Sequence, residues 1–309
     1  MTVPTAGPLM LIDAAGLYFR AFYGVPESVT SPSGQPVNAV RGFLDMTATL
    51  ISRRRPARYV ACLDLDWRPA FRVALVPSYK AHRVGPDGAE AIPEALGQQV
   101  PILLEVLAAL GLATAGAASF EADDVIATLA ARAASAGQPV EVVTGDRDLI
   151  ALANDRVRVL YTGRGLAKME DLGPAEVEAK YGIPPALYAD FAVLRGDPSD
   201  GLPGVAGVGA KTAATLVNRF GPIEKIIEAA RAGADGLPAG RKIIDAAGYL
   251  LAAAAVVRGC TEVPLPEVAD ELPAEPANPA RLIELADTHG VSSSINRVLV
   301  ALAGLARPV

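Results

Sequence analysis

Residues 194–212 read LRGDPSDGLPGVAGVGAKT, and this stretch decides how the second half of the chain is interpreted. Its first part places Asp197 and Asp200 three residues apart, around a Pro-Ser turn. Its second part carries three glycines and a basic-hydroxyl pair before an apolar run: Gly204, Gly207, Gly209, Lys211 and Thr212. Glycines let backbone N–H groups approach an anion, and a helix N-terminus adds partial positive charge. The stretch therefore offers carboxylates for a metal beside amides for a phosphate.

The glycines fit one phosphate-binding pattern poorly and another well. A P-loop needs its second glycine directly before the lysine, whereas Ala210 separates Gly209 from Lys211 here. No strand-like run precedes the glycines either. The pattern G-V-G between two helical runs resembles a helix-hairpin-helix turn, which binds a DNA backbone. For the segment alone, an ordinary glycine-rich loop is the alternative.

Composition narrows the class of protein. The 309 residues predict about two domains, and a hydrophobic content of 51% is sufficient for a large core. Cys62 and Cys260 form no C-x-x-C pair, which argues against a zinc ribbon or a disulfide scaffold and favours a reducing compartment. The sequence shows no long apolar run and no signal peptide. We expect a soluble cytoplasmic protein with no membrane contact.

The net charge of −6 is unevenly distributed. Residues 52–83 hold eight basic residues against two acidic ones, and residues 201–260 hold seven against four. Residues 261–309 are acidic, with three basic residues against seven. A local basic face matters more than the total for binding a nucleic-acid backbone. A solvated arginine-rich surface is the alternative for residues 53–55.

Short apolar runs alternate with helical patterns through the first half of the chain. The runs cover residues 8–12, 58–63, 140–144 and 157–161, and the helical patterns cover residues 38–52, 102–110 and 121–136. This alternation predicts a parallel α/β sheet, in which ligands bind beyond the carboxyl ends of the strands. Asp13, Asp64 and Asp146 follow three of those ends.

The remaining segments are predicted from their prolines, glycines and apolar spacing. Residues 76–101 are rich in proline and glycine, which interrupt helices and strands, so we predict a loop or mobile segment there. The pattern becomes helical from Tyr181, and the proline-rich residues 262–279 read as an extended connector. Two closing helices are expected over residues 281–306.

Acidic residues form four groups, which are Asp13; Asp64 with Asp66; Glu121, Asp123 and Asp124 with Asp146 and Asp148; and Asp197 with Asp200. Taken singly, each could be a helix cap or turn residue. Together they would repel one another without cations, and oxygen ligands suit Mg²⁺ or Mn²⁺. His82 and His289 are the only histidines, so a histidine base is hard to build and a metal would have to generate hydroxide.

Six motifs in order, between about residues 9 and 217, make the chain resemble the 5′-nuclease or flap endonuclease family. This family includes the N-terminal domain of bacterial DNA polymerase I. The motifs are Leu11-Ile12-Asp13; Asp64 followed by Phe71-Arg72; Tyr79-Lys80-Ala81-His82-Arg83; Glu121-Ala122-Asp123-Asp124; Thr144-Gly145-Asp146-Arg147-Asp148; and the stretch 194–212. Because no polymerase region follows, we expect a free-standing bacterial nuclease.

The resemblance implies a role for each matching residue. Two or three Mg²⁺ or Mn²⁺ ions would be held by Asp13, Asp64, Glu121, Asp123, Asp124, Asp146, Asp148, Asp197 and Asp200. The catalytic set would be Asp13, Asp64, Asp123, Asp124, Asp146, Asp148, Arg72 and Lys80. DNA would be bound by Arg20, Arg72, Lys80, Arg83, Gly204, Gly207, Gly209, Lys211 and Thr212. A potassium ion in the hairpin is common in the family.

One spacing departs from the family. Five residues usually separate the second aspartate from Phe-Arg, whereas Asp64 leaves six and Asp66 leaves four. We prefer Asp64 because it follows the apolar run. All the acidic positions that can be checked are filled, so an active enzyme is expected.

The implied fold is α/β: a PIN-like parallel sheet flanked by helices, with a helical helix-three-turn-helix portion. We place the nuclease core in residues 1–175, with an arch over about residues 76–100, and the DNA-binding portion in residues 176–309. The implied activity is a 5′-flap endonuclease and 5′→3′ exonuclease acting on flaps, nicks or gapped duplexes, with no obligate protein partner. A PIN-like ribonuclease and a non-catalytic DNA-junction binding protein are the alternatives.

Overall fold

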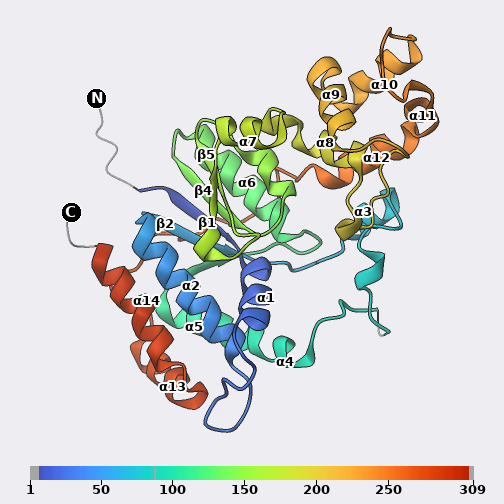
Figure 1. Cartoon of the computed structure of the whole chain (residues 1–309). Helices are drawn as coiled ribbons and strands as arrows, with labels where there is room; N and C mark the ends of the chain where they lie inside the picture. The colour runs from blue at the N-terminus through green and yellow to red at the C-terminus, as the bar shows by residue number, and fades with distance from the viewer. Residues whose placement is uncertain (1–6, 87, 306–309) are drawn as a thin grey trace, which may run out of the picture.

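A six-stranded sheet forms the centre of the computed structural model, which describes residues 7–86 and 88–305 (Figure 1). Its strand order is β3-β2-β1-β4-β5-β6. The strands are β1 (Leu9–Asp13), β2 (Arg58–Cys62), β3 (Ala113–Ala115), β4 (Val140–Thr144), β5 (Val157–Tyr161) and β6 (Glu170–Leu172). All neighbours are parallel except β6, which pairs antiparallel with β5. The predicted parallel sheet is confirmed, whereas the two three-residue edge strands were too short to show a pattern.

Both faces of the sheet are buried, and β1 shows how. Leu9 and Leu11 enter one core, and the alternate residues Met10 and Ile12 enter the other. Helix α6 (Ala122–Ser135) covers the first face, while α1 (Ala14–Gly24), α2 (Asn38–Arg54) and α5 (Gln99–Leu110) cover the second. A strand buried on both sides reads as a continuous apolar run, which explains why these runs were recognisable in the sequence.

Segment 76–101 is more regular than expected. It follows α3 (Ala70–Leu75) and contains η1 (Ala81–Arg83) and α4 (Glu94–Gly97), and α5 begins at Gln99 rather than at residue 102. Pro101 lies in the first turn of α5, where a missing N–H costs nothing. The buried Gln99 side chain fixes this start by accepting a hydrogen bond from Ala39 N at 2.7 Å. The mobility of the arch stays a prediction.

A helical body follows the sheet and lies to one side of it (Figure 1). After α7 (Pro174–Tyr181), which lies over the sheet, it comprises η4 (Pro185–Leu187), α8 (Tyr188–Arg195), η5 (Pro198–Asp200), α9 (Ala210–Phe220), α10 (Ile223–Arg231), α11 (Gly240–Asp245) and α12 (Ala247–Val257). Two short turns lie earlier, between strands: η2 (Asp148–Leu152) before β5 and η3 (Leu166–Lys168) before β6. Leu216, Ile226 and Leu250 are among the fully buried residues of the helical body. The same buried cluster continues to the α6 face of the sheet.

The last two helices bear on the expected domain division. α13 (Pro279–His289) and α14 (Ser292–Leu305) form as predicted but pack against α5 and α2, beside the sheet (Figure 1). Their apolar residues, including Leu285 and Val298, belong to the core that contains Met10. α13 and α14 therefore pack with the sheet rather than with α8–α12, and the division of the chain near residue 176 stays a prediction. None of the described helices is long and apolar enough to span a membrane.

Candidate nuclease site

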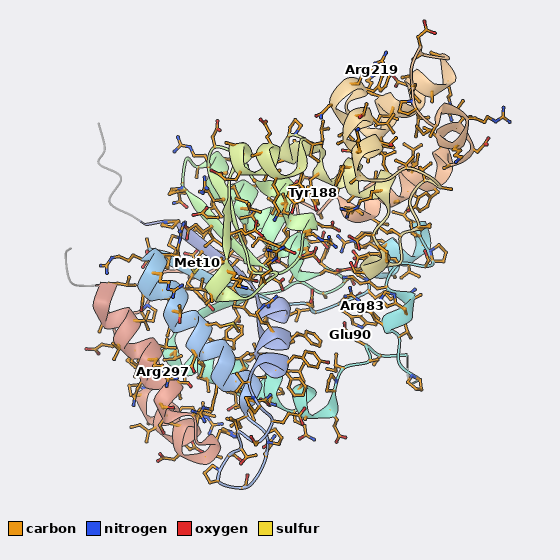
Figure 2. All side chains as sticks on the ribbon, in the orientation of Figure 1. Met10, Arg83, Glu90, Tyr188, Arg219 and Arg297 are labelled. Atoms are coloured by element: carbon orange, nitrogen blue, oxygen red, sulfur yellow. The ribbon has the colours of Figure 1, made fainter. Side chains whose placement is uncertain are left out.

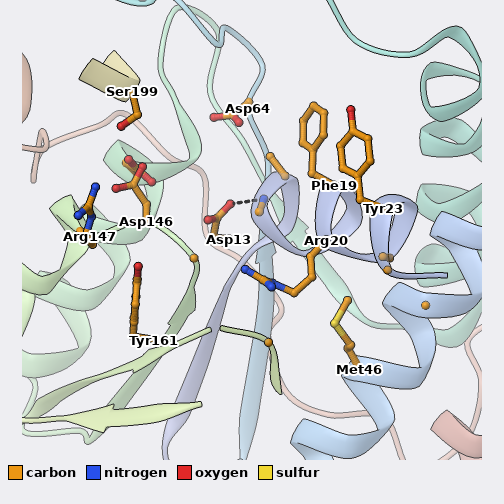
Figure 3. Close-up of a pocket in the computed structure, with 18 of the residues that line it drawn as sticks. Asp13, Phe19, Arg20, Tyr23, Met46, Asp64, Asp146, Arg147, Tyr161 and Ser199 are labelled. Atoms are coloured by element: carbon orange, nitrogen blue, oxygen red, sulfur yellow. Dashed lines mark hydrogen bonds between the residues drawn. The ribbon is translucent and has the colours of Figure 1, made fainter. Parts of the chain in front are cut away.

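The carboxyl ends of the parallel strands open into a cleft of about 1010 Å³. Its acidic lining comes from seven separate segments and consists of Asp13, Asp45, Asp64, Glu90, Glu121, Asp123, Asp146 and Asp197. Asp13, Asp64 and Asp146 point into the same space (Figure 3). The topology therefore brings together the three strand-end aspartates that the sequence predicted.

Asp13 is the most fixed of these carboxylates. It ends β1 and caps α1, since Oδ1 accepts a hydrogen bond from Gly16 N and Oδ2 from Thr144 Oγ1, both at 2.8 Å. A Cβ at residue 16 would lie 2.4 Å from Asp13 Oδ2, so this contact requires glycine. Burial, together with the nearby charges of Asp64 and Asp146, raises the pKa of Asp13 to about 6, although its two hydrogen bonds act to lower it.

Asp123 and Asp148 lie in a similarly repulsive environment. Burial, followed by the charge of Asp146, raises the pKa of both carboxyl groups well above the usual range. Asp148 Oδ1 is buried and has no hydrogen-bond partner among the residues that the structure describes. Within that same part of the chain, no three acidic, histidine or cysteine side chains converge tightly enough to hold an ion without moving. Like charges that repel one another are expected to stand apart in this way.

Asp64 and Asp66 take different roles. Asp64 lines the cleft, and its Oδ1 accepts a hydrogen bond from Ala122 N at 2.6 Å. Asp66 does not line it and instead caps its own turn, accepting from Arg68 N at 3.1 Å. This geometry supports the choice of Asp64.

Arg72 and Asp124 do not line the cleft, although both belong to the predicted site. Arg72 is 3% exposed, and its guanidinium lies 2.7 Å from Asp124 and 3.0 Å from Glu121. Asp124 is fully buried and is the third residue of α6. Its Oδ2 accepts a hydrogen bond from the backbone N–H of Glu121, the residue that precedes the helix. The other oxygen accepts from Cys260 N at 2.8 Å. Both residues are thus buried ion-pair partners here, and their predicted roles as a DNA contact and a metal ligand stay predictions.

Two cations of the predicted set do face the cleft. Lys80 adopts a left-handed backbone conformation, with φ +48°, and donates a hydrogen bond to the Glu121 carboxylate. A non-glycine residue in this region is strained, and such strain is often found at functional sites. Arg83 lies 3.3 Å from Asp200 and close to Glu90 (Figure 2). These two cations therefore lie where a phosphate beside the acids would need them.

The two aspartates of the opening stretch separate. Asp197 lines the cleft and accepts a hydrogen bond from Ser199 N at 2.9 Å. Asp200 is buried and lines a second, smaller cavity together with Asp123 and Asp148. Burial raises the pKa of Asp200 to about 6 against the lowering effect of the Lys80 charge. Both lie beside the acidic group, as predicted.

The cleft also contains residues that carried no motif signal. Phe19 and Tyr23 line it although neither belongs to a motif, and Arg147 lines it from within the Thr144–Asp148 motif without having been assigned a role. Arg20, expected to bind DNA, also lines the cleft (Figure 3). Its Nε is buried without a hydrogen-bond partner in the described chain. Because this Nε is buried, it is out of reach of an anion in the cleft, and only the terminal guanidinium nitrogens of Arg20 could contact one.

The predicted hairpin connects α8 to α9. Gly204 and Gly207 have φ +69° and +81°, and a Cβ at residue 204 would lie 2.4 Å from Gly196 N. Gly209 has φ −92° and open space around it, so the turn does not itself require glycine there. Lys211 is exposed in the first turn of α9. Lys242, which sequence reasoning missed, joins the hairpin from α11 by donating to Ala206 O at 2.9 Å.

Two protein-family models together match most of the chain. Residues 8–182 match "5′-3′ exonuclease, N-terminal resolvase-like domain", and residues 183–280 match "5′-3′ exonuclease, C-terminal SAM fold". The chain belongs to the 5′-3′ exonuclease family. This family assignment confirms the resemblance and the expected α/β fold with a helical portion.

Named relatives match this chain over different shares of its length. A protein named 5′-3′ exonuclease from Mycobacterium tuberculosis is 52% identical, over 96% of this chain and 98% of its own. A DNA polymerase I from Mycobacterium bovis is 43% identical over 71% of this chain but only 24% of its own. A solved structure of a bacteriophage T5 flap endonuclease with DNA and metal ions has a TM-score of 0.61 at 16% identity, covering 95% of this chain and 98% of its own.

Proposed function

We propose that this protein is a divalent-metal-dependent 5′ nuclease acting on DNA, with flap endonuclease and 5′→3′ exonuclease activity. The observation that carries the proposal is the acidic cleft at the carboxyl ends of β1, β2 and β4. There, burial and mutual repulsion raise the pKa values of Asp13 and Asp123. Carboxylates are held together at such a cost when cations bind among them. Membership of the 5′-3′ exonuclease family supports the same activity.

The residues present fit divalent ions. The cleft supplies only oxygen ligands from carboxylates, which suits Mg²⁺ or Mn²⁺. Asp148 Oδ1 is buried without a partner in the described residues, which a cation or its water would satisfy. The ligand set would be Asp13, Asp64, Glu121, Asp123, Asp146, Asp148, Asp197 and Asp200. When bound, two or three ions would lower the pKa of a ligated water and balance charge on the phosphodiester.

The cations of the cleft would orient the substrate. Arg20 and Arg83 both line the cleft, so their guanidinium groups would donate to phosphate oxygens there, and Arg83 would exchange its contact with Asp200 for a phosphate. Lys80 is bound to Glu121, and this pairing fixes its ammonium beside the acids. The hairpin with Lys211 would bind the duplex backbone, with K⁺ as a further ligand of that turn. The segment 76–100 would form the arch over the single strand.

Two alternative functions, a non-catalytic DNA-junction binder and a PIN-like ribonuclease, would each leave one feature of the structure without a role. A non-catalytic junction binder needs no carboxylates at the strand ends, and a PIN-like ribonuclease needs no hairpin. We propose DNA flaps, nicks or gapped duplexes as substrates, no obligate protein partner, and action in the cytoplasm at the nucleoid. The family members that carry "5′-3′ exonuclease" as their name favour catalysis over simple binding.

Cleavage of a 5′-labelled flap substrate tests the proposal. With Mg²⁺ we expect cutting near the junction, leaving a 5′ phosphate and a 3′ hydroxyl, and with EDTA we expect binding without cutting. An RNA flap of the same sequence separates a ribonuclease from a deoxyribonuclease. Tight binding without cleavage in Mg²⁺ and in Mn²⁺ would instead identify a junction-binding protein.

A further inference from the structure

A second cavity of about 190 Å³ reaches the acidic group from elements that do not line the cleft. It is bounded by η2, η4, α8 and the end of α12, whereas the cleft is bounded by α1, α2 and the strand ends. Asp123 lines both spaces, and Asp148 and Asp200 line the cavity. The acids therefore separate two approaches, of which the cleft is the one that DNA would cover.

The inner end of this cavity is built for water and cations. Asp148 Oδ1 is buried and lacks a hydrogen-bond partner among the described residues. A buried carboxylate oxygen without a protein partner is normally satisfied by water or an ion. Arg72, the basic residue at this end, is already paired with Glu121 and Asp124. The Lys80 charge also acts on the acids here, so at the inner end the three carboxyl groups of Asp123, Asp148 and Asp200 outnumber the basic groups that are left to balance them.

The outer end reaches the protein surface. Ala186, Arg258 and Gly259 line the cavity and are all exposed. The Arg258 guanidinium lies 2.6 Å from Asp190 and 2.8 Å from Glu224, so two carboxylates offset its single charge. Small residues line the cavity between its two ends, namely Ala127, Ala151 and Ala189, alongside larger apolar ones such as Leu152 and Val257.

We propose that this cavity is a rear channel through which water and hydrated divalent cations reach the acidic group while DNA covers the cleft. The inference rests on the proposed function, because it assumes that metal binds at the acids and DNA in the cleft. A passage with negative inner charge attracts cations, and its width and lining decide the rate of transit. The ligand class is a hydrated divalent cation such as Mg²⁺ or Mn²⁺.

The test measures Mn²⁺ binding rather than cleavage. Mn²⁺ is mixed rapidly with the protein alone or with the protein bound to a flap DNA carrying an uncleavable methylphosphonate at the scissile position. Loss of the free Mn²⁺ paramagnetic resonance signal gives the association rate. Ala186→Leu narrows the exposed mouth, and Ala189→Leu fills the channel deeper inside. Ala255→Leu is the matched control, because Ala255 is exposed on α12 but does not line the channel.

In the DNA complex, we expect Ala186→Leu and Ala189→Leu to slow Mn²⁺ association about tenfold or more, since transit depends on the channel width. In free protein the open cleft should keep the rates of all variants close to wild type. An unchanged rate for both channel variants in the complex overturns the proposal. Equal slowing with and without DNA also overturns it, because it indicates damage to the acids. Failure of wild-type protein to bind Mn²⁺ at all would instead refute the proposed function.

Discussion

The Asp124 carboxylate lies 2.7 Å from the Arg72 guanidinium, and neither side chain is more than 4% exposed. Removing one member of a buried ion pair leaves an uncompensated charge. Asp124→Ala is therefore expected to lower the free energy of unfolding by about 3–5 kcal/mol. Urea denaturation monitored by circular dichroism measures this loss. A variant as stable as wild type but unable to cleave would show that Asp124 is a ligand after all.

Asp146→Asn should show the opposite behaviour. Asp146 lines the cleft, and an amide neither balances a cation nor ligates it as well, so single-turnover cleavage should fall at least about 100-fold. Stability and flap binding should stay near wild type. Asp155→Asn is the control, because Asp155 is an exposed acid after η2. Cleavage above a few per cent of wild type at saturating Mg²⁺ would count against the metal assignment.

Asp13 should make the metal-free protein less stable as the pH rises. Its folded-state pKa is about 6, above the ordinary 3.8, so the folded state binds the proton more tightly. The stability it contributes is complete below about pH 4 and is lost as the pH passes 6, a change of about 2–3 kcal/mol. In EDTA, the free energy of unfolding of Asp13→Asn, compared with that of wild type, should rise by this amount between pH 4 and pH 7.5. A stability difference that does not vary over this range would contradict the prediction.

Lys211→Ala should weaken duplex binding whatever the sequence. If Lys211 contacts a phosphate, the log–log slope of affinity against salt should fall by about 0.9. Anisotropy titrations in the Asp146→Asn background give the slope for a flap and for a single strand. Lys225→Ala is the control, because it removes an exposed lysine that pairs with Glu228 on α10. Equal weakening on flap and single strand would rule out a duplex contact.

The hairpin glycines should differ in their tolerance of a side chain. Gly204→Ala is expected to destabilise the turn by about 1 kcal/mol or more, because alanine is strained at positive φ and its Cβ would clash with the Gly196 backbone. Gly209→Ala should leave stability unchanged, since φ is −92° and nothing lies nearby. Thermal unfolding compares the two. Equal losses would mean that the turn differs from the one described.

Much of the fold was predictable because the signals were local. Residues 9–13, 58–62 and 140–144 are buried on both faces, so each appears as an apolar run with an aspartate at or just after its end. Parallel topology then places those aspartates at one edge. β3 and β6 gave no signal, because three residues cannot establish a period.

The site was harder to predict because a motif specifies which residue stands at each position but not the direction in which its side chain points. Asp123 and Asp124 are adjacent, yet helical geometry turns one toward the cleft and buries the other against Arg72. Lys242 reaches the hairpin from a helix some thirty residues away. Such a contact depends on tertiary packing, which no spacing in the sequence reveals.

The return of the chain to the sheet has a mechanical consequence. The connector after α12 is held to β2, where Arg58 Nε donates to Asp270 at 2.6 Å, and α14 then packs on α2. The helical body is thus joined to the sheet at both of its ends. A body joined once can swivel about its linker, whereas one joined twice resists rotation. If duplex DNA is held at the hairpin and cut at the strand ends, this double attachment fixes how many base pairs separate the two points.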